Sequence, residues 1–356
     1  MANSEAREYL SRIGIQRIQE LDTALIEVFG SEEGERHIKN LTELFDRAEM
    51  RLIYGTEESD RGNSHPQSAV QARDGLSPKN SVPDSAHKKD SLYLRRQSEL
   101  VDYLNQNLSL SLLASSYYDR IFFQKAMDYL IRAERYFKED ICEVGCGNGI
   151  LTCFLAQRYP DSAVTGLDLS ANAVSVAKVL KEQLAICNAA FYQQDISDMD
   201  ISAQASSEPA LSSLSLTDLI FNENPSQNQK QEPFQILLSC RTIHENVAWP
   251  PLAAKQSQKS CPENEENETS QHQLSLAELT ALHRPYAQVL ANLVNPGGYL
   301  ISVERYEADS SYDGLLHALE EAGFSREKGT HEQFSCKNGD ETATFQAIIL
   351  KRVNLQ

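Results

Sequence analysis

The sequence predicts an α/β fold, in which an N-terminal helical region precedes a doubly wound seven-stranded sheet with a terminal antiparallel hairpin. Three observations support this fold class. From residue 140 onward, apolar runs of strand length alternate with helical stretches, which is typical of βαβ units and a parallel sheet. A glycine-rich turn joins the first of these runs to a helix. The last two runs are separated by Asn338-Gly339, a strong hairpin signal.

Composition limits the class of protein. With 356 residues the chain is long enough for one large domain or two ordinary domains. Its net charge of −18 argues against a nucleic-acid partner. No apolar run approaches the roughly 18 residues of a membrane helix, and the first residues lack an apolar signal core, so no membrane association is expected. Seven irregularly spaced cysteines indicate reduced thiols, and we therefore expect a cytoplasmic protein.

The N-terminal region is predicted to be helical. Apolar residues recur at helical spacing over residues 5–29 and again over residues 35–54, with Gly30-Ser31 between the two stretches. This pattern predicts an N-terminal helical hairpin over residues 1–55. Its apolar stripes need a partner. The hairpin is either a cap on the following domain or an element through which the chain forms a homodimer.

A polar stretch separates this hairpin from the rest of the chain. Residues 56–90 are rich in Ser, Asn, Asp, Gly and Pro and contain almost no large apolar side chain, which predicts a flexible linker. Residues 91–137 are predicted to be a helical segment that leads into the next domain, with helices at 91–108 and 116–138.

The remaining elements follow in a regular order over residues 138–356. Strands are predicted at 140–144, 163–168, 190–194, 234–239, 299–304, 332–335 and 343–350, and helices from Ile150 and at 171–183, 274–294 and 312–322. The turn Asn295-Pro296-Gly297-Gly298 is predicted to precede the fifth strand. Two polar stretches, at 201–232 and 255–273, are predicted to be flexible insertions, either solvated loops or a mobile lid over the substrate.

The glycine-rich turn carries the main functional signal. Residues 141–149 read Ile-Cys-Glu-Val-Gly-Cys-Gly-Asn-Gly, and a helical pattern starts at Ile150. Such a turn lets a ligand approach the backbone closely. Nineteen residues beyond Gly149, Asp168 ends the next predicted strand, where a carboxylate can accept hydrogen bonds from ribose hydroxyls. The sequence therefore predicts a cofactor that contains a nucleoside.

Details of the turn indicate which cofactor. The dinucleotide fingerprint has glycine or alanine three residues after its second glycine, where this chain has Ile150. Glu143 would repel a pyrophosphate but tolerates an ammonium group. With its acid-x-G-x-G-x-G motif, the chain resembles the class I S-adenosylmethionine-dependent methyltransferases, which have a seven-stranded Rossmann-like sheet, over roughly residues 115 to 352. The resemblance implies S-adenosylmethionine (SAM) as cofactor and a SAM-dependent methyltransferase domain at residues 138–356.

The resemblance also implies which residues bind the cofactor. In this family an acid after the third strand accepts a hydrogen bond from the adenine amino group, and its apolar neighbour packs on the ring; Asp195 and Ile196 match these positions. Residues ahead of the helix that precedes the first strand often face the amino-acid end of the cofactor. The residues expected to contact the cofactor are Tyr117, Glu143, Gly145, Cys146, Gly147, Gly149, Asp168, Leu169, Asp195, Ile196 and Ser239.

Candidate catalytic residues follow the fourth strand, at the sheet edge where open α/β sheets bind ligands. Residues 239–242 read Ser-Cys-Arg-Thr and lack the Asn/Asp-Pro-Pro-Tyr/Phe motif of enzymes that methylate amino groups of nucleic acids and glutamine. His244 is a candidate general base that Glu245 would orient, and Arg241 is a candidate ligand for a substrate carboxylate. The alternative is a helix start with polar residues, or an Arg–Glu surface pair.

We expect the chain to transfer a methyl group from SAM to an oxygen or nitrogen nucleophile of a small molecule or peptide. One alternative is a catalytically inactive protein of the same fold that binds partners, and another is a nicotinamide-dependent oxidoreductase. Cys142, Cys146 and Cys153 do not have the spacing of an iron–sulfur or zinc site, so no metal site is expected.

Overall fold

The structure of the protein is a computed structural model. It describes residues 2–54, 99–196, 233–242, 274–306, 309–338 and 341–353. The linker predicted at 56–90 and the insertions predicted at 201–232 and 255–273 lie outside the described residues, as do His244 and Glu245.

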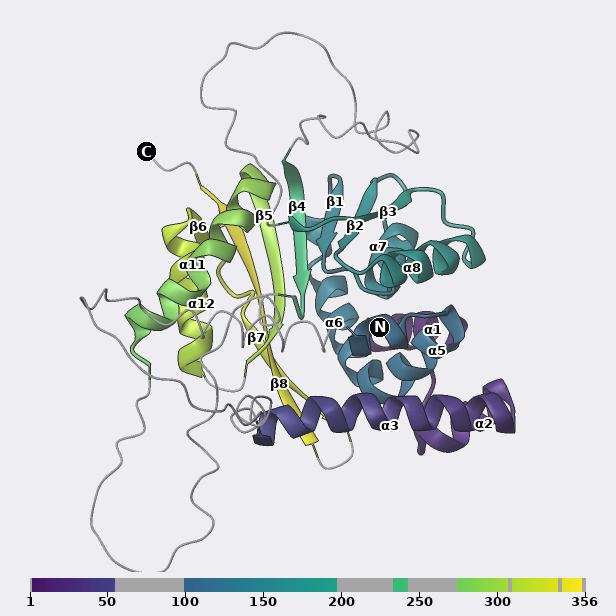
Figure 1. The fold of residues 1–356 in the computed structure, drawn as a ribbon. Coiled ribbons are helices and arrows are strands. Elements are labelled where there is room, and N and C mark those ends of the chain that lie inside the picture. Colours follow the sequence, from purple (N-terminus) through teal and green to yellow (C-terminus); the bar gives the residue numbers. More distant parts are fainter. Residues whose placement is uncertain are drawn as a thin grey trace, which may run out of the picture.

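A central sheet organises the chain (Figure 1). Its strands are β1 (Ile141–Val144), β2 (Val164–Asp168), β3 (Ala189–Gln193), β4 (Phe234–Cys240), β5 (Val294–Arg305), β6 (Phe324–Arg326), β7 (Glu332–Asn338) and β8 (Glu341–Arg352). The order is β3-β2-β1-β4-β5-β8-β6. Strands β1 to β5 are parallel, and β8 is antiparallel to β5. Strands β6 and β7 both pair with the other edge of β8, at different residues, so the eight described strands occupy seven positions across the sheet. The predicted fold class is thereby confirmed.

Two details of the sheet differ from the predictions. Strand β5 begins at Val294, so the expected turn at residues 295–298 is part of the strand, and the register against β4 shifts there. The backbones approach closely at this shift, since a Cβ on Gly298 would lie 2.6 Å from the Gln235 carbonyl oxygen. Strand β6 was not predicted because its three residues are too few to show an alternating pattern.

Helices cover both faces of the sheet (Figure 1). They are α1 (Ala2–Arg12), α2 (Leu21–Phe29), α3 (Ser31–Tyr54), α5 (Leu108–Ala114), α6 (Arg120–Arg132), α7 (Ile150–Arg158), α8 (Ala171–Gln183), α11 (Leu276–Leu293) and α12 (Asp309–Glu321), with a helical stretch at 99–104. Alternate residues of the strands enter opposite cores: Ile236 and Leu238 pack with α6 and α7, whereas Leu237 packs with α11 and α12. None of the described helices combines the length and apolarity of a membrane-spanning segment.

The prediction of one helix over residues 5–29 was wrong. The chain turns at Gly14, where φ is +87°, and forms α1 and α2 instead. Ile13 and Ile15 in the connection are buried, so the apolar spacing continues although the helix does not. Helix α1 packs against α6 and α7, and the Tyr9 hydroxyl donates to the Ile150 carbonyl oxygen (2.9 Å).

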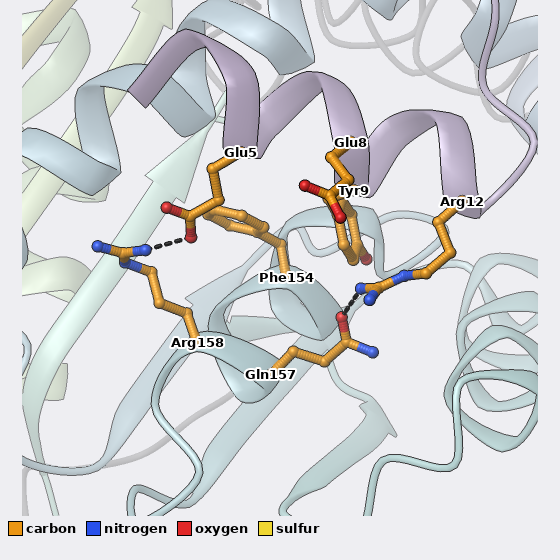
Figure 2. Close-up of a pocket in the computed structure, with 7 residues that line it drawn as sticks. All are labelled: Glu5, Glu8, Tyr9, Arg12, Phe154, Gln157 and Arg158. Carbon is orange, nitrogen blue, oxygen red and sulfur yellow. Dashed lines mark hydrogen bonds and ion pairs between the residues drawn. The ribbon is translucent and has the colours of Figure 1, made fainter. Parts of the chain in front are cut away.

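A cavity of about 250 Å³ lies between α1 and α7 (Figure 2). Arg158 forms an ion pair with Glu5 across it, and Arg12 donates to Gln157. The side chains that line this cavity therefore bind one another and join α1 to the second half of α7.

The hairpin expected in the N-terminal region is formed by α2 and α3, which pack closely at Gly34. Helix 99–104 and α5 cover the apolar side of this hairpin, around the buried residues Leu25, Leu41, Leu110 and Leu113. We call these four helices the helical cap. The apolar stripes thus have a partner in the same chain, while dimerisation and the division into domains stay predictions.

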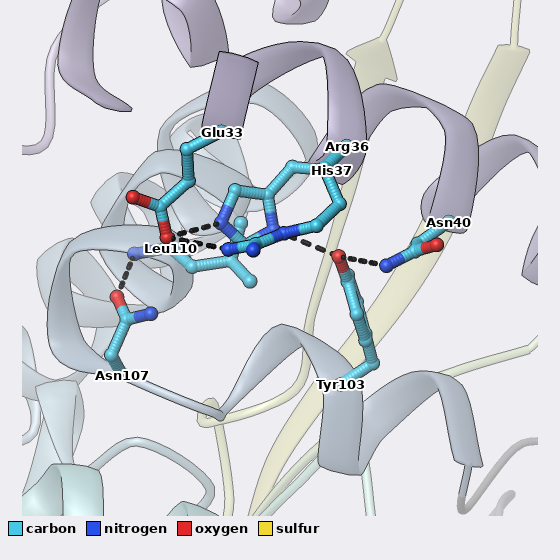
Figure 3. Close-up of polar contacts among 7 residues, drawn as sticks. All are labelled: Glu33, Arg36, His37, Asn40, Tyr103, Asn107 and Leu110. Carbon is cyan, nitrogen blue, oxygen red and sulfur yellow. Dashed lines mark hydrogen bonds and ion pairs between the residues drawn. The ribbon is translucent and has the colours of Figure 1, made fainter. Parts of the chain in front are cut away.

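A small polar cluster joins α3 to helix 99–104 (Figure 3). The Tyr103 hydroxyl lies 2.8 Å from Nδ1 of His37 and accepts a hydrogen bond from the Asn40 amide (3.1 Å). His37 is buried, and burial lowers the pKa of its imidazole. The neutral ring therefore fits between Phe29 and Tyr103.

The helix predicted at 116–138 begins earlier. Asn107 caps α5 by accepting a hydrogen bond from the Leu110 backbone (2.9 Å), and a π-helical turn, Ser115–Asp119, connects α5 to α6. A π turn adds one residue to the helical turn, and such turns are frequent at functional sites. The sequence does not reveal this π turn, because α-helices precede and follow it and the helical spacing of apolar residues continues around it.

Candidate active site at the carboxyl edge of the sheet

The glycine turn connects β1 to α7 at the carboxyl edge of the sheet. Gly145, Gly147 and Gly149 have φ values of +68°, +53° and +77°, a region that favours glycine. A Cβ on Gly145 would overlap the Thr242 side chain, and a Cβ on Gly149 would lie 2.7 Å from Cβ of Ala177. Within the described part of the chain, apart from its two neighbours in sequence, no atom lies within 4 Å of a Cβ built on Gly147. Gly147 is therefore the glycine that a ligand can approach.

Asp168 lies beside this turn at the end of β2. Its Oδ2 accepts a hydrogen bond from the Gly147 backbone N–H (2.7 Å), and its Oδ1 accepts one from the Ser170 N–H (2.8 Å). Burial raises the pKa of Asp168, although these hydrogen bonds oppose the shift. The next residue, Leu169, is 63% exposed. A hydrogen-bond acceptor and an exposed apolar side chain thus meet at the edge of the turn.

Glu143 is the buried acid of the motif, with only 2% of its surface exposed. It accepts a hydrogen bond from the Thr152 hydroxyl on α7. Burial raises the pKa of Glu143 to about 8, and the negative charge of Asp168 adds to the shift. A cation placed beside Glu143 would favour its ionised form. Its environment therefore suits a positively charged ligand group.

Helix α5 and the π turn contact the glycine turn directly. The Asn148 amide donates to the hydroxyls of Ser111 and Ser115, each at 2.9 Å. Sequence reasoning missed these two serines, and the only signal was the asparagine between the glycines. In the π turn, the ring of Tyr117 packs edge-on against Tyr118 with centroids 4.8 Å apart. Tyr117 thus lies in the π turn, which contacts the glycine turn through Ser115.

Other residues predicted to contact the cofactor lie just after the carboxyl ends of β1 and β3. Asp195 and Ile196 come after β3 and are half-buried, and the Gln194 N–H donates to the Asp168 carbonyl oxygen (2.9 Å). Cys146 is buried beneath the turn, and burial raises the pKa of its thiol well above the ordinary value, so it is an unreactive core residue.

The structure does not bring the Ser239 side chain to the open part of the site. Ser239 lies on β4, is fully buried and donates to Oε1 of Glu304 on β5 (2.7 Å). Its side chain is on the sheet face that α11 and α12 cover, because Leu237 two residues earlier packs there.

Arg241 follows β4 and has a left-handed backbone, with φ of +59°, which is uncommon for a residue other than glycine. Its N–H donates to the Val303 carbonyl oxygen (3.0 Å). The guanidinium pairs with Asp119 of the π turn and lies over the Phe122 ring, 5.2 Å from its centroid. The structure thus joins Arg241 to the helix ahead of β1, while His244 and Glu245 lie outside the described residues.

Comparison with known proteins identifies this arrangement. Residues 138–309 match the family described as "Methyltransferase domain". This segment is a class I SAM-dependent methyltransferase domain. The predicted enzyme class and the predicted cofactor are thereby confirmed. A comparison with curated proteins found no match.

Several solved methyltransferase structures are similar to the chain. A magnesium protoporphyrin IX methyltransferase from Synechocystis PCC 6803 with bound SAH has 15% identity and a TM-score of 0.41, and the alignment covers 72% of this chain and 99% of that one. A putative RNA methyltransferase from Pyrococcus horikoshii has 11% identity and a TM-score of 0.39, with 67% and 85% covered. A ribosomal protein L11 methylase from Lactobacillus delbrueckii subsp. bulgaricus has 13% identity and a TM-score of 0.35, with 65% and 80% covered.

The residues of the methyltransferase domain fit SAM. The open space over Gly147 gives access to the backbone, Asp168 has lone pairs left for ribose hydroxyls, and buried Glu143 suits a cationic group nearby. SAM supplies a methyl group on a sulfonium, which is already activated for transfer. The protein then has to align the acceptor with that methyl group and exclude water.

Proposed function

We propose that the domain transfers the methyl group of SAM to an oxygen or nitrogen nucleophile of a small molecule or peptide that carries a carboxylate. The observation that carries the proposal is Arg241, a cation held in a left-handed backbone at the carboxyl end of β4. Strained residues of this kind persist where the surrounding structure holds them, and they concentrate at functional sites.

The surroundings of Arg241 support an anionic acceptor. The guanidinium lies over the Phe122 ring and is paired with Asp119, so these two side chains fix its orientation. Lys125 lies over the Phe334 ring, 5.9 Å from its centroid, and both Phe334 and Phe122 pack against Phe345. A carboxylate would bind the fork of the guanidinium through two parallel hydrogen bonds, in competition with Asp119.

The nucleophile needs a base only if it arrives protonated. His244, three residues beyond Arg241 in the sequence, stays the candidate for that role, with Glu245 as its orienting partner. Unchanged turnover of the His244→Ala enzyme across the pH range would remove this hypothesis.

The test begins with calorimetric binding of SAM to the full chain, followed by a screen of hydroxylated and amino-acid-like acceptors with SAH release as the readout. We expect Arg241→Gln to raise KM for a carboxylate-bearing acceptor by about tenfold, the usual effect of losing a charged hydrogen bond. The matched control is Arg284→Gln, because Arg284 is an exposed arginine paired with Glu321.

Two results would contradict the proposal. The first is equal turnover of the acceptor and of its methyl ester, which would show that no carboxylate is recognised. The second is a well-folded chain that binds SAM but methylates neither hydroxylated nor amino-acid-like acceptors. That result would favour an inactive, partner-binding protein.

A further inference from the structure

The helical cap reaches the cofactor site through Asp102 on helix 99–104. Oδ1 of Asp102 accepts a hydrogen bond from the Ser170 hydroxyl (2.6 Å), and its backbone carbonyl oxygen accepts one from the Asn172 amide (3.1 Å). Ser170 is the N-cap of α8, where its hydroxyl also accepts a hydrogen bond from the Ala173 N–H (3.2 Å). Helix 99–104 is therefore tied to the first turn of α8.

Ser170 also holds the acid of the cofactor site. Its backbone N–H donates to Oδ1 of Asp168 (2.8 Å), while the Gly147 N–H donates to Oδ2 (2.7 Å). A continuous series of hydrogen bonds thus runs from Asp102 through Ser170 and Asp168 to the glycine turn. A small movement of Ser170 would rotate the Asp168 carboxylate.

We propose that Asp102 is a positioning residue for the nucleoside end of SAM, because it fixes Ser170 and thereby aims the Asp168 carboxylate at the ribose hydroxyls. The inference rests on the methyl-transfer function proposed above. It makes the helical cap part of the cofactor site, so that release of helix 99–104 weakens cofactor binding.

The charge of Asp102 has a second effect. The charged or titratable groups that interact with Asp168 include Asp102 on helix 99–104, Glu143 on β1 and the Cys146 thiol in the turn. The Asp102 charge adds to burial in raising the pKa of Asp168. A carboxylate with a higher pKa is a better hydrogen-bond acceptor for the ribose hydroxyls. Protonation at low pH removes its negative charge and weakens it as an acceptor.

The experiment measures SAH binding to the full chain by calorimetry from about pH 3.5, below the ordinary range of carboxyl pKa values, to about pH 8. Asp102→Asn keeps an acceptor for the Ser170 hydroxyl and removes the charge. We expect affinity within about threefold of the parent at neutral pH, with the acidic loss of binding moved to lower pH. Asp102→Ala loses both features and should bind SAH about tenfold more weakly.

Two controls separate positioning from general stability. Glu99→Gln makes the same charge change on an exposed residue of the same helix and should leave affinity and pH profile unchanged. In a Ser170→Ala background, Asp102→Ala should have little further effect on SAH affinity at neutral pH, since the positioning action of Asp102 passes through the missing hydroxyl.

The proposal is overturned if Asp102→Asn leaves the pH dependence of SAH binding unchanged. It is also overturned if Asp102→Ala weakens SAH binding equally in the parent and in the Ser170→Ala background. Failure of the parent chain to bind SAH would instead count against the methyltransferase function. Normal SAH binding with no effect of Asp102 variants would remove the positioning role alone.

Discussion

At the scale of single residues, two acids at the carboxyl edge of the sheet have different surroundings. Asp168 accepts hydrogen bonds from the Gly147 and Ser170 N–H groups next to an exposed leucine, whereas Glu143 is enclosed and accepts a hydrogen bond from the Thr152 hydroxyl. Two carboxyl groups therefore differ in character: Asp168 is a hydrogen-bond acceptor at the edge of the turn, and Glu143 is a buried group with a raised pKa. Burial is the cause, because it penalises the charged form.

The pKa of Glu143 predicts how stability depends on pH. The folded-state pKa of about 8 exceeds the ordinary 4.5, so the folded chain binds the proton more tightly than the unfolded chain. Its stabilising contribution is present below pH 4.5 and is lost as pH rises through about 8. Glu143→Gln should remove this slope and be more stable than the parent above pH 8.

Urea denaturation of the ligand-free chain at several pH values, followed by circular dichroism, measures this difference. Glu139→Gln, on an acid ahead of β1 that is not part of the buried site, is the control. A parent and a Glu143→Gln variant with parallel pH dependence would show that Glu143 does not carry the proton.

At the scale of elements, the glycine turn, the π turn and the helical cap are held together by side chains that are far apart in the sequence. Asn148 joins the glycine turn to α5 and the π turn, and Arg241 joins the π turn to β4. Tyr103 joins helix 99–104 to α3 (Figure 3). The surroundings of the glycine turn therefore depend on how these helices pack against it.

Removal of the Tyr103 hydroxyl tests this dependence. Tyr103→Phe leaves Nδ1 of His37 and the Asn40 amide without their shared partner, and should lower the free energy of unfolding by about 1–3 kcal/mol. Because helix 99–104 carries Asp102, SAH affinity should fall as well. Denaturation and calorimetry on the same samples measure both effects. Tyr136→Phe serves as control, because it removes a hydroxyl that contacts Arg135 and Glu327 in the turn between α6 and β1. A loss of stability with full affinity would separate the cap from the site.

At the scale of the whole molecule, α1 belongs to the core of the methyltransferase domain, whereas α2 and α3 pack in a core of their own with helix 99–104 and α5. The chain thus crosses from one core to the other between Ile15 and Leu21 and returns through α5. N-terminal residues consequently contribute both to the core on one face of the sheet and to the core of the helical cap.

Leu10→Ala tests whether α1 is part of the cooperative unit. Leu10 is buried against the core, so the cavity should lower the free energy of unfolding by about 2–5 kcal/mol while unfolding remains a single transition. Ile26→Ala on α2, where the side chain is exposed, should cost much less. Thermal unfolding by calorimetry gives both values. An early separate transition in Leu10→Ala would show that α1 unfolds independently.

The order of strands β1 to β5, the glycine turn and Asp168 at the end of β2 could be predicted from the sequence, because these depend on local periodicity and on backbone angles that glycine allows. Helix α8 matches its predicted bounds for the same reason. The tertiary structure decided the break at Gly14, the Ser239–Glu304 hydrogen bond, the left-handed Arg241 and the contact of Asp102 with Ser170. Each of these depends on residues brought together by packing, and no local pattern in the chain records which side chains will meet.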